Sequence, residues 1–149
     1  YQEDEEQQIR ESDNLEGVRI LVADDNELNL EIMFEIFNSS GAAVDCAHNG
    51  KEALEAYLKS SQGYYQIILM DVHMPEMNGL EATKEIRNSG RPDACSVPII
   101  AMTADVFKED IRRCQDAGMN AHMGKPVELD KLYSTVRKLL NKEALGEKQ

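Results

Sequence analysis

Five short, strand-like runs alternate along the chain with five stretches of helical periodicity. The runs cover residues 18–23, 42–47, 67–71, 97–102 and 121–123. They are too short for ordinary helices, and the longest are too continuously apolar for strands with one face in water. Alternation of this kind predicts a parallel sheet that is covered by helices on both faces, with right-handed crossovers between strands.

The helical stretches are predicted at residues 27–40, 51–60, 79–88, 106–117 and from 129 onward. Their inner faces are predicted from apolar spacing. The predicted inner face comprises Leu28, Ile32, Met33, Ile36 and Phe37 in the first helix, Ala53, Leu54, Tyr57 and Leu58 in the second helix, and Leu129, Leu132, Tyr133, Val136, Leu139 and Leu140 in the last helix. The predicted fold is therefore α/β, a flavodoxin-like (βα)5 doubly wound sheet with strand order 2-1-3-4-5.

Charge separates the predicted domain from the segment before it. Residues 1–16 hold seven acids and one base, which is half of the formal net charge of −12. We expect residues 1–16 to be an acidic, solvated linker, residues 17–141 to be the domain, and residues 142–149 to be a tail. Because the chain does not begin with Met, we also expect it to be a piece of a longer protein.

Composition excludes several classes of function for this piece. The net negative charge and the lack of a basic stripe argue against direct nucleic acid binding. No apolar run is long enough for membrane insertion, although a longer parent chain could be anchored elsewhere. Three cysteines without C-x-x-C spacing fit a reducing, cytoplasmic compartment.

Acidic residues stand at the ends of two predicted strands that the strand order makes neighbours. Asp24 and Asp25 follow the first strand, and Asp71 ends the third. Ligands of open α/β sheets bind beyond the carboxyl ends of the strands. Three carboxylates gathered there repel one another unless a cation lies among them, and oxygen ligands without His or Cys favour Mg²⁺. Asp71 could then act as a nucleophile toward phosphorus.

Two other strand ends offer the groups that phosphoryl transfer needs. Thr103 supplies a hydroxyl after the fourth strand, Ala104 beside it leaves room, and Lys125 supplies a positive charge after the fifth. The bond before Pro126 is a candidate cis peptide that would aim Lys125 inward. Each residue alone has a structural explanation: Asp25 or Asn26 could simply cap the first helix. The joint pattern of acids, Thr and Lys-Pro at successive strand ends is what predicts a site.

These residues resemble the receiver domain of two-component signalling over about residues 17–141. The matching stretches are 20–26 (Ile-Leu-Val-Ala-Asp-Asp-Asn), 70–79 (Met-Asp-Val-His-Met-Pro-Glu-Met-Asn-Gly), 102–104 (Met-Thr-Ala) and 124–126 (Gly-Lys-Pro). The run from Asp24 to Glu31 and the acidic leader are more similar to receivers of hybrid histidine kinases than to free-standing ones.

The resemblance implies a role for each matched residue. Asp71 would accept phosphate from a phosphohistidine. Mg²⁺, with Mn²⁺ as a substitute, would bind Asp25, Asp71 and the backbone carbonyl of His73, and Asp24 would assist through water. Thr103 and Lys125 would bind the phosphoryl group and signal its presence. The implied partners are a histidine kinase or histidine phosphotransfer domain, and a homodimer could form through the fourth helix, fifth strand and last helix.

The sequence departs from the family pattern at one predicted switch position. Many members have Tyr or Phe three residues before the lysine, where this chain has His122. One hypothesis is that His122 rotates inward as Thr103 moves and adds pH sensitivity; the other is an exposed histidine on an edge strand. His73 and Asp105 flank the site entrance, at positions that tune phosphate lifetime in this family.

Three functions are consistent with these patterns. The first is a receiver that catalyses its own phosphorylation and dephosphorylation without being a turnover enzyme, while its parent could be a hybrid histidine kinase. The second is a docking module that ignores phosphate, which should lack part of the acid, Thr and Lys set. The third is a phosphatase with an Asp nucleophile; such enzymes commonly carry a second acid where this chain has His73.

Overall fold

The computed structural model describes residues 15–103, 108–124 and 128–146 of the chain. Within them, one parallel sheet contains β1 (Arg19–Ala23), β2 (Ala43–Ala47), β3 (Ile67–Asp71), β4 (Ile99–Thr103) and β5 (Ala121–Gly124). The strand order is β2-β1-β3-β4-β5, which confirms the predicted fold. The helices are α2 (Glu27–Ser39), α3 (Gly50–Lys59), α4 (Gly79–Arg87), α5 (Lys108–Ala117) and α6 (Leu129–Gly146).

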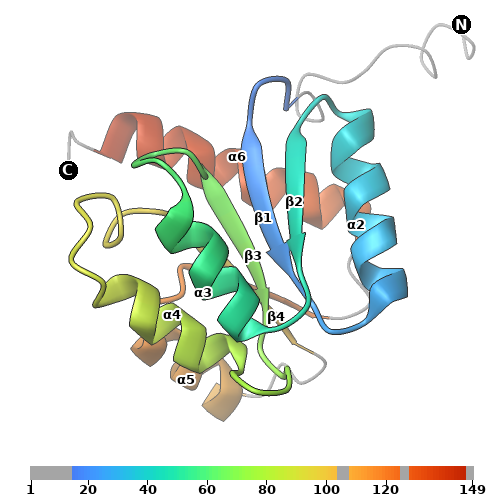
Figure 1. Ribbon diagram of the computed structural model, residues 1–149. Coiled ribbons are helices and arrows are strands. Elements are labelled where there is room, and N and C mark those ends of the chain that lie inside the picture. The colour runs from blue at the N-terminus through green and yellow to red at the C-terminus, as the bar shows by residue number, and fades with distance from the viewer. Residues whose placement is uncertain (1–14, 104–107, 125–127, 147–149) are drawn as a thin grey trace, which may run out of the picture.

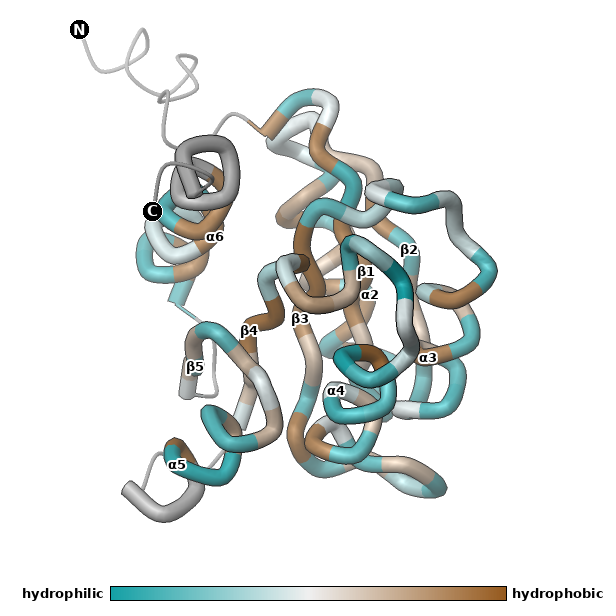
Figure 2. The backbone as a smooth tube through the Cα atoms, turned by 90° about the vertical axis from the view of Figure 1, so that its left-hand side faces the viewer, coloured by the Kyte–Doolittle hydropathy of each residue, from teal (hydrophilic) through white to brown (hydrophobic). Residues whose placement is uncertain are grey.

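The helices form two layers, one on each face of the sheet (Figure 1). Buried residues of α3, α4 and α5 pack with one side of the strands, and those of α2 and α6 pack with the other. Every residue of β3 is buried, as expected for a central strand covered on both faces. In Figure 2 the hydrophobic colour follows parts of β1, β3 and β4, while α3 and α5 are mostly hydrophilic. None of the described helices is both long and apolar enough to span a membrane.

Four residues assigned to inner helix faces are exposed instead. In α2, Leu28 is 62% and Ile32 48% exposed, while Leu30, Met33 and Phe37 form the buried stripe. Leu58 of α3 and Leu129 of α6 are also exposed. The prediction was wrong at these four positions. In α2 the reason is that apolar residues lie around more than half of the helix circumference. Periodicity alone then does not determine which stripe meets the sheet.

Described structure is found on the outer side of both predicted domain boundaries. Leu15, which we assigned to the acidic linker, is 1% exposed and packs in the core on the α2 and α6 side. Its backbone N–H donates to the carbonyl of Ser40, 2.8 Å away, so the chain is held just before β1 begins. At the other end, α6 continues to Gly146, past the predicted boundary at residue 141.

The loop between β3 and α4 contains a tight turn at Glu76. The Met77 N–H donates to the Pro75 carbonyl at 2.6 Å, and Glu76 between them has a φ of +66°. This is the geometry of a classic γ-turn, which is strained for residues with a Cβ. We expect Glu76→Gly to raise the free energy of unfolding by about 0.5–1 kcal/mol, because glycine adopts this conformation without a steric penalty.

Urea unfolding of the two proteins measures this difference. Glu55→Gly, an exposed site within α3, is the control and should lower stability by about 1 kcal/mol. If both substitutions destabilise the domain equally, Glu76 is not strained.

Candidate functional site

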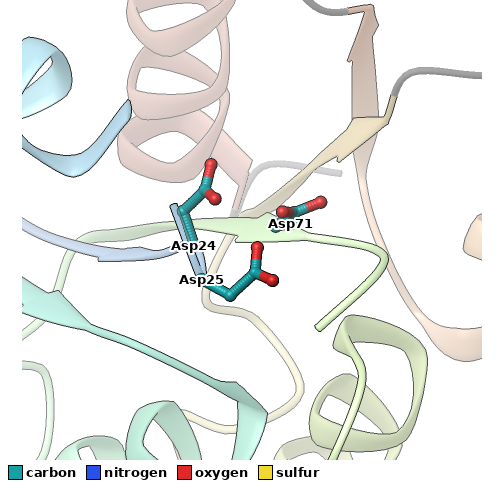
Figure 3. Close-up of side chains that lie close together, drawn as sticks. All are labelled: Asp24, Asp25 and Asp71. Atoms are coloured by element: carbon teal, nitrogen blue, oxygen red, sulfur yellow. The ribbon is translucent and has the colours of Figure 1, made fainter. Parts of the chain in front are cut away.

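The register of the sheet brings the three predicted acids to one place. Ala23 pairs with Met70, so the next residues, Asp24 and Asp71, leave neighbouring strands at the same edge. Ligand atoms of Asp24, Asp25 and Asp71 all lie within 4.8 Å of one another. Figure 3 shows the three carboxylates gathered beyond the ends of β1 and β3. The predicted convergence of these acids is therefore what the structure contains.

Burial divides the cluster into an inner and an outer part. Asp24 is 1% and Asp71 3% exposed, whereas Asp25 faces solvent. Buried carboxylates are costly unless they are hydrogen-bonded or paired with positive charge. Asp71 accepts a 3.3 Å hydrogen bond from the backbone N–H of His73, and both Asp24 and Asp71 have further interactions. The cluster therefore consists of two largely buried carboxylates and one exposed carboxylate.

Helix capping at this edge is done by Asn26. Its side chain accepts the backbone N–H of Asn29 at 3.1 Å, which caps the first turn of α2. Of the two capping residues that the sequence allowed, Asn26 is therefore the cap and Asp25 is not. The carboxylates of Asp24 and Asp25 are not used for capping, and both lie close to the carboxylate of Asp71.

The polypeptide behind Asp71 is tightly packed by α4. Gly79, the first residue of α4, donates its N–H to the Val72 carbonyl at 3.0 Å. A Cβ added at Gly79 would overlap the carbonyl oxygen of Asp71 and approach the Met70 side chain to 2.9 Å. The Asn78 and Glu81 capping box then starts the helix. The loop is therefore folded back onto the strand end that carries Asp71.

The remaining predicted site residues are distributed around this cluster. Thr103 ends β4, next to β3, and is 2% exposed. His73 follows Asp71 by two residues and is exposed. His122 lies on the edge strand β5, also exposed, at the wall of a cavity of about 390 Å³ between α5, β5 and α6. Lys125, Pro126, Ala104 and Asp105 lie outside the described residues.

A histidine links the N-terminal turns of α2 and α3. His48 Nε2 lies 3.1 Å from Glu27 Oε1, and Nδ1 lies 3.1 Å from Glu52 Oε1. The hydrogen bond to Glu52 and the nearby charge of Glu27 raise the pKa of His48. Two hydrogen bonds from His48 lower the pKa of Glu52. The bond from the backbone N–H has the larger effect, and the bond from the imidazole has the smaller one. The folded domain therefore favours the ion pair, although His48 is about half exposed.

This pair predicts a pH-dependent contribution to stability. A raised folded-state pKa gives His48 a contribution that is present below its ordinary pKa of 6.5 and lost as pH rises through the folded value. Glu52 keeps its contribution until pH falls below its ordinary 4.5. The stability difference between wild type and His48→Gln should therefore be about 0.5 kcal/mol near pH 5.5 and shrink toward pH 8.5.

Urea unfolding of wild type, His48→Gln, Glu52→Gln and the double variant at both pH values measures the coupling. A coupling energy that is the same at pH 5.5 and pH 8.5 would show that charge on His48 does not contribute.

Sequence reasoning missed one polar residue at the cluster. Asn29 Nδ2 donates to Asp24 Oδ2 at 3.3 Å, while the backbone N–H of Asn26 donates to Asp24 Oδ1 at 2.9 Å. The available signal was spacing, since Asn29 occupies the third position of a helix whose cap follows directly after the acids. A side chain at that position can reach back past the cap.

Comparison with known proteins gives the same family for the whole fold. The model of the response regulator receiver domain matches residues 20–137. Hybrid signal transduction histidine kinase L of Dictyostelium discoideum is 36% identical over 136 residues, which are 89% of this chain and 8% of that protein. The sensory/regulatory protein RpfC of Xanthomonas campestris pv. campestris is 33% identical over 88% of this chain and 18% of its own length. The chain thus spans a small part of these relatives.

Solved structures show the same architecture. The receiver domain of sensor histidine kinase PA1611 from Pseudomonas aeruginosa, which has a magnesium ion coordinated in its active site cleft, matches with a TM-score of 0.75 and 31% identity. The match covers 84% of this chain and 98% of that one. Vibrio cholerae CheY4 has the same TM-score at 24% identity, covering 82% and 98% of the two chains, and shows the fold. The matched family model, the relatives and the acids at the strand ends lead to one conclusion: this chain belongs to the response regulator receiver domain family.

Proposed function

We propose that this domain takes a phosphoryl group from a phosphohistidine onto Asp71, in a Mg²⁺-dependent reaction, and changes conformation to relay a two-component signal. The observation that carries the proposal is the convergence of Asp24, Asp25 and Asp71 within 4.8 Å at the edge of a receiver fold. An Asp71 oxygen would attack phosphorus, the P–N bond would break, and the imidazole would leave with the bonding pair and take up a proton.

The donor set fits Mg²⁺. All three side chains of the cluster offer hard carboxylate oxygens, and the group includes no His or Cys atom. Asp25 and Asp71, with the backbone carbonyl of His73, are proposed as direct ligands, and Asp24 as a ligand to a bound water. When bound, Mg²⁺, or Mn²⁺ in its place, supplies positive charge that offsets the negative charge of the phosphoryl oxygens.

The residues of the chain have separate tasks in this proposal. Asp71 is held at the strand end by the backbone of Val72 and Gly79, and its burial limits access of water. Thr103 would donate its hydroxyl to a phosphoryl oxygen, and Lys125 would pair with another. Both would move when the phosphoryl group arrives, which shifts the population between two packings of the domain.

The output proposals concern α5, β5 and α6. The cavity beside His122 is lined by residues of these three elements and of the turn before β5, among them Ile111, Cys114, Met119, Lys138 and Leu139. We propose this face for homodimerisation or partner binding after phosphorylation, and His122 as the residue that responds to Thr103. If His122→Ala leaves the affinity of the phosphorylated domain for its partner unchanged, the switch role of His122 is wrong.

Phosphate lifetime should depend on the exposed residue beside the nucleophile. We expect His73→Gly to change the rate of dephosphorylation several-fold while phosphorylation survives, because His73 is exposed and its backbone N–H contacts the Asp71 carboxylate. Asp105, which follows Thr103 by two residues in the sequence, has the corresponding proposed role. Intact mass measured over time after removal of the donor gives the lifetime, and equal lifetimes for wild type and His73→Gly would refute the role.

The proposal is tested with the wild-type domain and phosphoramidate, a small P–N donor, in the presence of Mg²⁺ or of excess EDTA. We expect intact mass to show one added phosphoryl group with Mg²⁺ and none with EDTA. No covalent product from a folded domain that binds Mg²⁺ would favour a docking module. Continuous phosphate release without a covalent product would favour a hydrolase.

A further inference from the structure

We propose that Asn29 is a positioning residue for the metal site, which orients Asp24 through a side-chain hydrogen bond. The inference rests on the proposed function, since it concerns how the carboxylate cluster binds Mg²⁺. Its basis is a pair of hydrogen bonds that fix both oxygens of one buried carboxylate. Asn26 N–H donates to Oδ1 of Asp24 at 2.9 Å, and Asn29 Nδ2 donates to Oδ2 at 3.3 Å.

The two asparagines connect Asp24 to the start of α2. Asn26 accepts the backbone N–H of Asn29 with its side chain and donates its own N–H to Asp24. The side chain of Asn29, in the first turn of the helix, donates a second hydrogen bond to the Asp24 carboxylate. The carboxylate is therefore held at two points by a rigid helix N-terminus. A fixed carboxylate loses little freedom when an ion or its water arrives, so less binding energy is spent on ordering the site.

The chemistry of the donor is suited to a cation site. Asp24 is buried beside two other carboxylates, so its charge needs stabilisation while the site must still attract a cation. A lysine or arginine at position 29 would stabilise the charge but repel Mg²⁺. The neutral amide of Asn29 donates a hydrogen bond without cancelling the negative charge of the cluster.

A purely structural role makes a different prediction. Asn29 lies within α2, where alanine has the higher helix propensity, so replacing Asn29 by Ala should favour the helix. If the side chain only served the helix, Asn29→Ala would leave Mg²⁺ binding unchanged. A positioning role predicts weaker binding in a protein whose helix content is intact.

The experiment measures Mg²⁺ affinity by isothermal titration calorimetry for wild type, Asn29→Ala and Asn38→Ala. Asn38 is an exposed residue near the other end of the same helix, so it is a matched control for the loss of an amide side chain. We expect Asn29→Ala to raise the Mg²⁺ dissociation constant about tenfold, as replacements of groups that orient metal ligands commonly do, and Asn38→Ala to leave it unchanged. Circular dichroism confirms that each variant is folded.

The outcomes separate this inference from the proposed function. If wild type and Asn29→Ala bind Mg²⁺ with equal affinity, the proposed role of Asn29 is wrong and the proposed metal site is still supported. Equal weakening by Asn29→Ala and Asn38→Ala would also overturn it, since the effect would then belong to the helix in general. A wild-type domain that does not bind Mg²⁺ would contradict the proposed function itself.

Discussion

An Asp71→Asn variant is expected to gain no phosphoryl group from phosphoramidate or acetyl phosphate at Mg²⁺ concentrations that label the wild-type domain. The substitution keeps the shape of the side chain at a position that is 3% exposed, so the core behind it is undisturbed. It removes the nucleophilic oxygen, because an amide oxygen does not form a stable bond to phosphorus. The expected effect is complete loss of labelling.

The matched control for this result is Asp116→Asn, which makes the same chemical change at an exposed position of α5. Asp116→Asn should be labelled like the wild type. Circular dichroism and urea unfolding show whether Asp71→Asn is folded. A folded Asp71→Asn domain that still gains one phosphoryl group would place the acceptor at another residue and would refute the assignment of Asp71.

Gly79→Ala is expected to have the largest effect on stability, a loss of about 3 kcal/mol. Gly79 begins α4, where alanine would ordinarily favour the helix by up to about 1 kcal/mol. Steric overlap reverses that expectation, since the added Cβ would meet the Asp71 carbonyl oxygen and, at 3.0 Å, its carbonyl carbon. Backbone atoms of a buried central strand have little room to move, so α4 or β3 must shift.

Urea unfolding measures this loss, with Gly90→Ala as the control. Gly90 has a φ of +88° and no atom within 4 Å of an added Cβ, so the control reports backbone strain without overlap and should cost about 1 kcal/mol. The folded fraction of Gly79→Ala should also be phosphorylated more slowly, because the overlap displaces the residue that carries the nucleophile. A Gly79→Ala domain as stable as wild type would show that the loop does not need this close approach.

Strand order and the placement of the acids could be predicted because they depend on local patterns. Short apolar runs separated by helical stretches predict a parallel sheet. Residues that directly follow the strands of such a sheet lie along its carboxyl edge. These patterns therefore predict that Asp24, Asp25 and Asp71 lie together, as they do in the structure. Thr103 was placed at the end of β4 by the same reasoning.

The remaining features depend on contacts between distant parts of the chain. Leu15 stands in an acidic segment, and its burial follows from meeting Ser40 and the core under α2. Leu28 and Ile32 have the same apolar character as the buried stripe of α2, and periodicity alone does not decide which of these residues the sheet covers. The hydrogen bond from Asn29 to Asp24 requires the first turn of α2 to lie against the end of β1. Residue types alone do not indicate this arrangement.

The most direct test of the central claim identifies the phosphorylated residue chemically. Sodium borohydride reduces an aspartyl phosphate to homoserine, and trypsin then separates the candidate residues, because cleavage after Lys59 and Lys84 gives a peptide whose only aspartate is Asp71. Asp24 and Asp25 fall in the peptide from Ile20 to Lys51. We predict homoserine at position 71, only after treatment with phosphoramidate and Mg²⁺. Homoserine at position 24 or 25, or none at position 71 of a labelled domain, would contradict it.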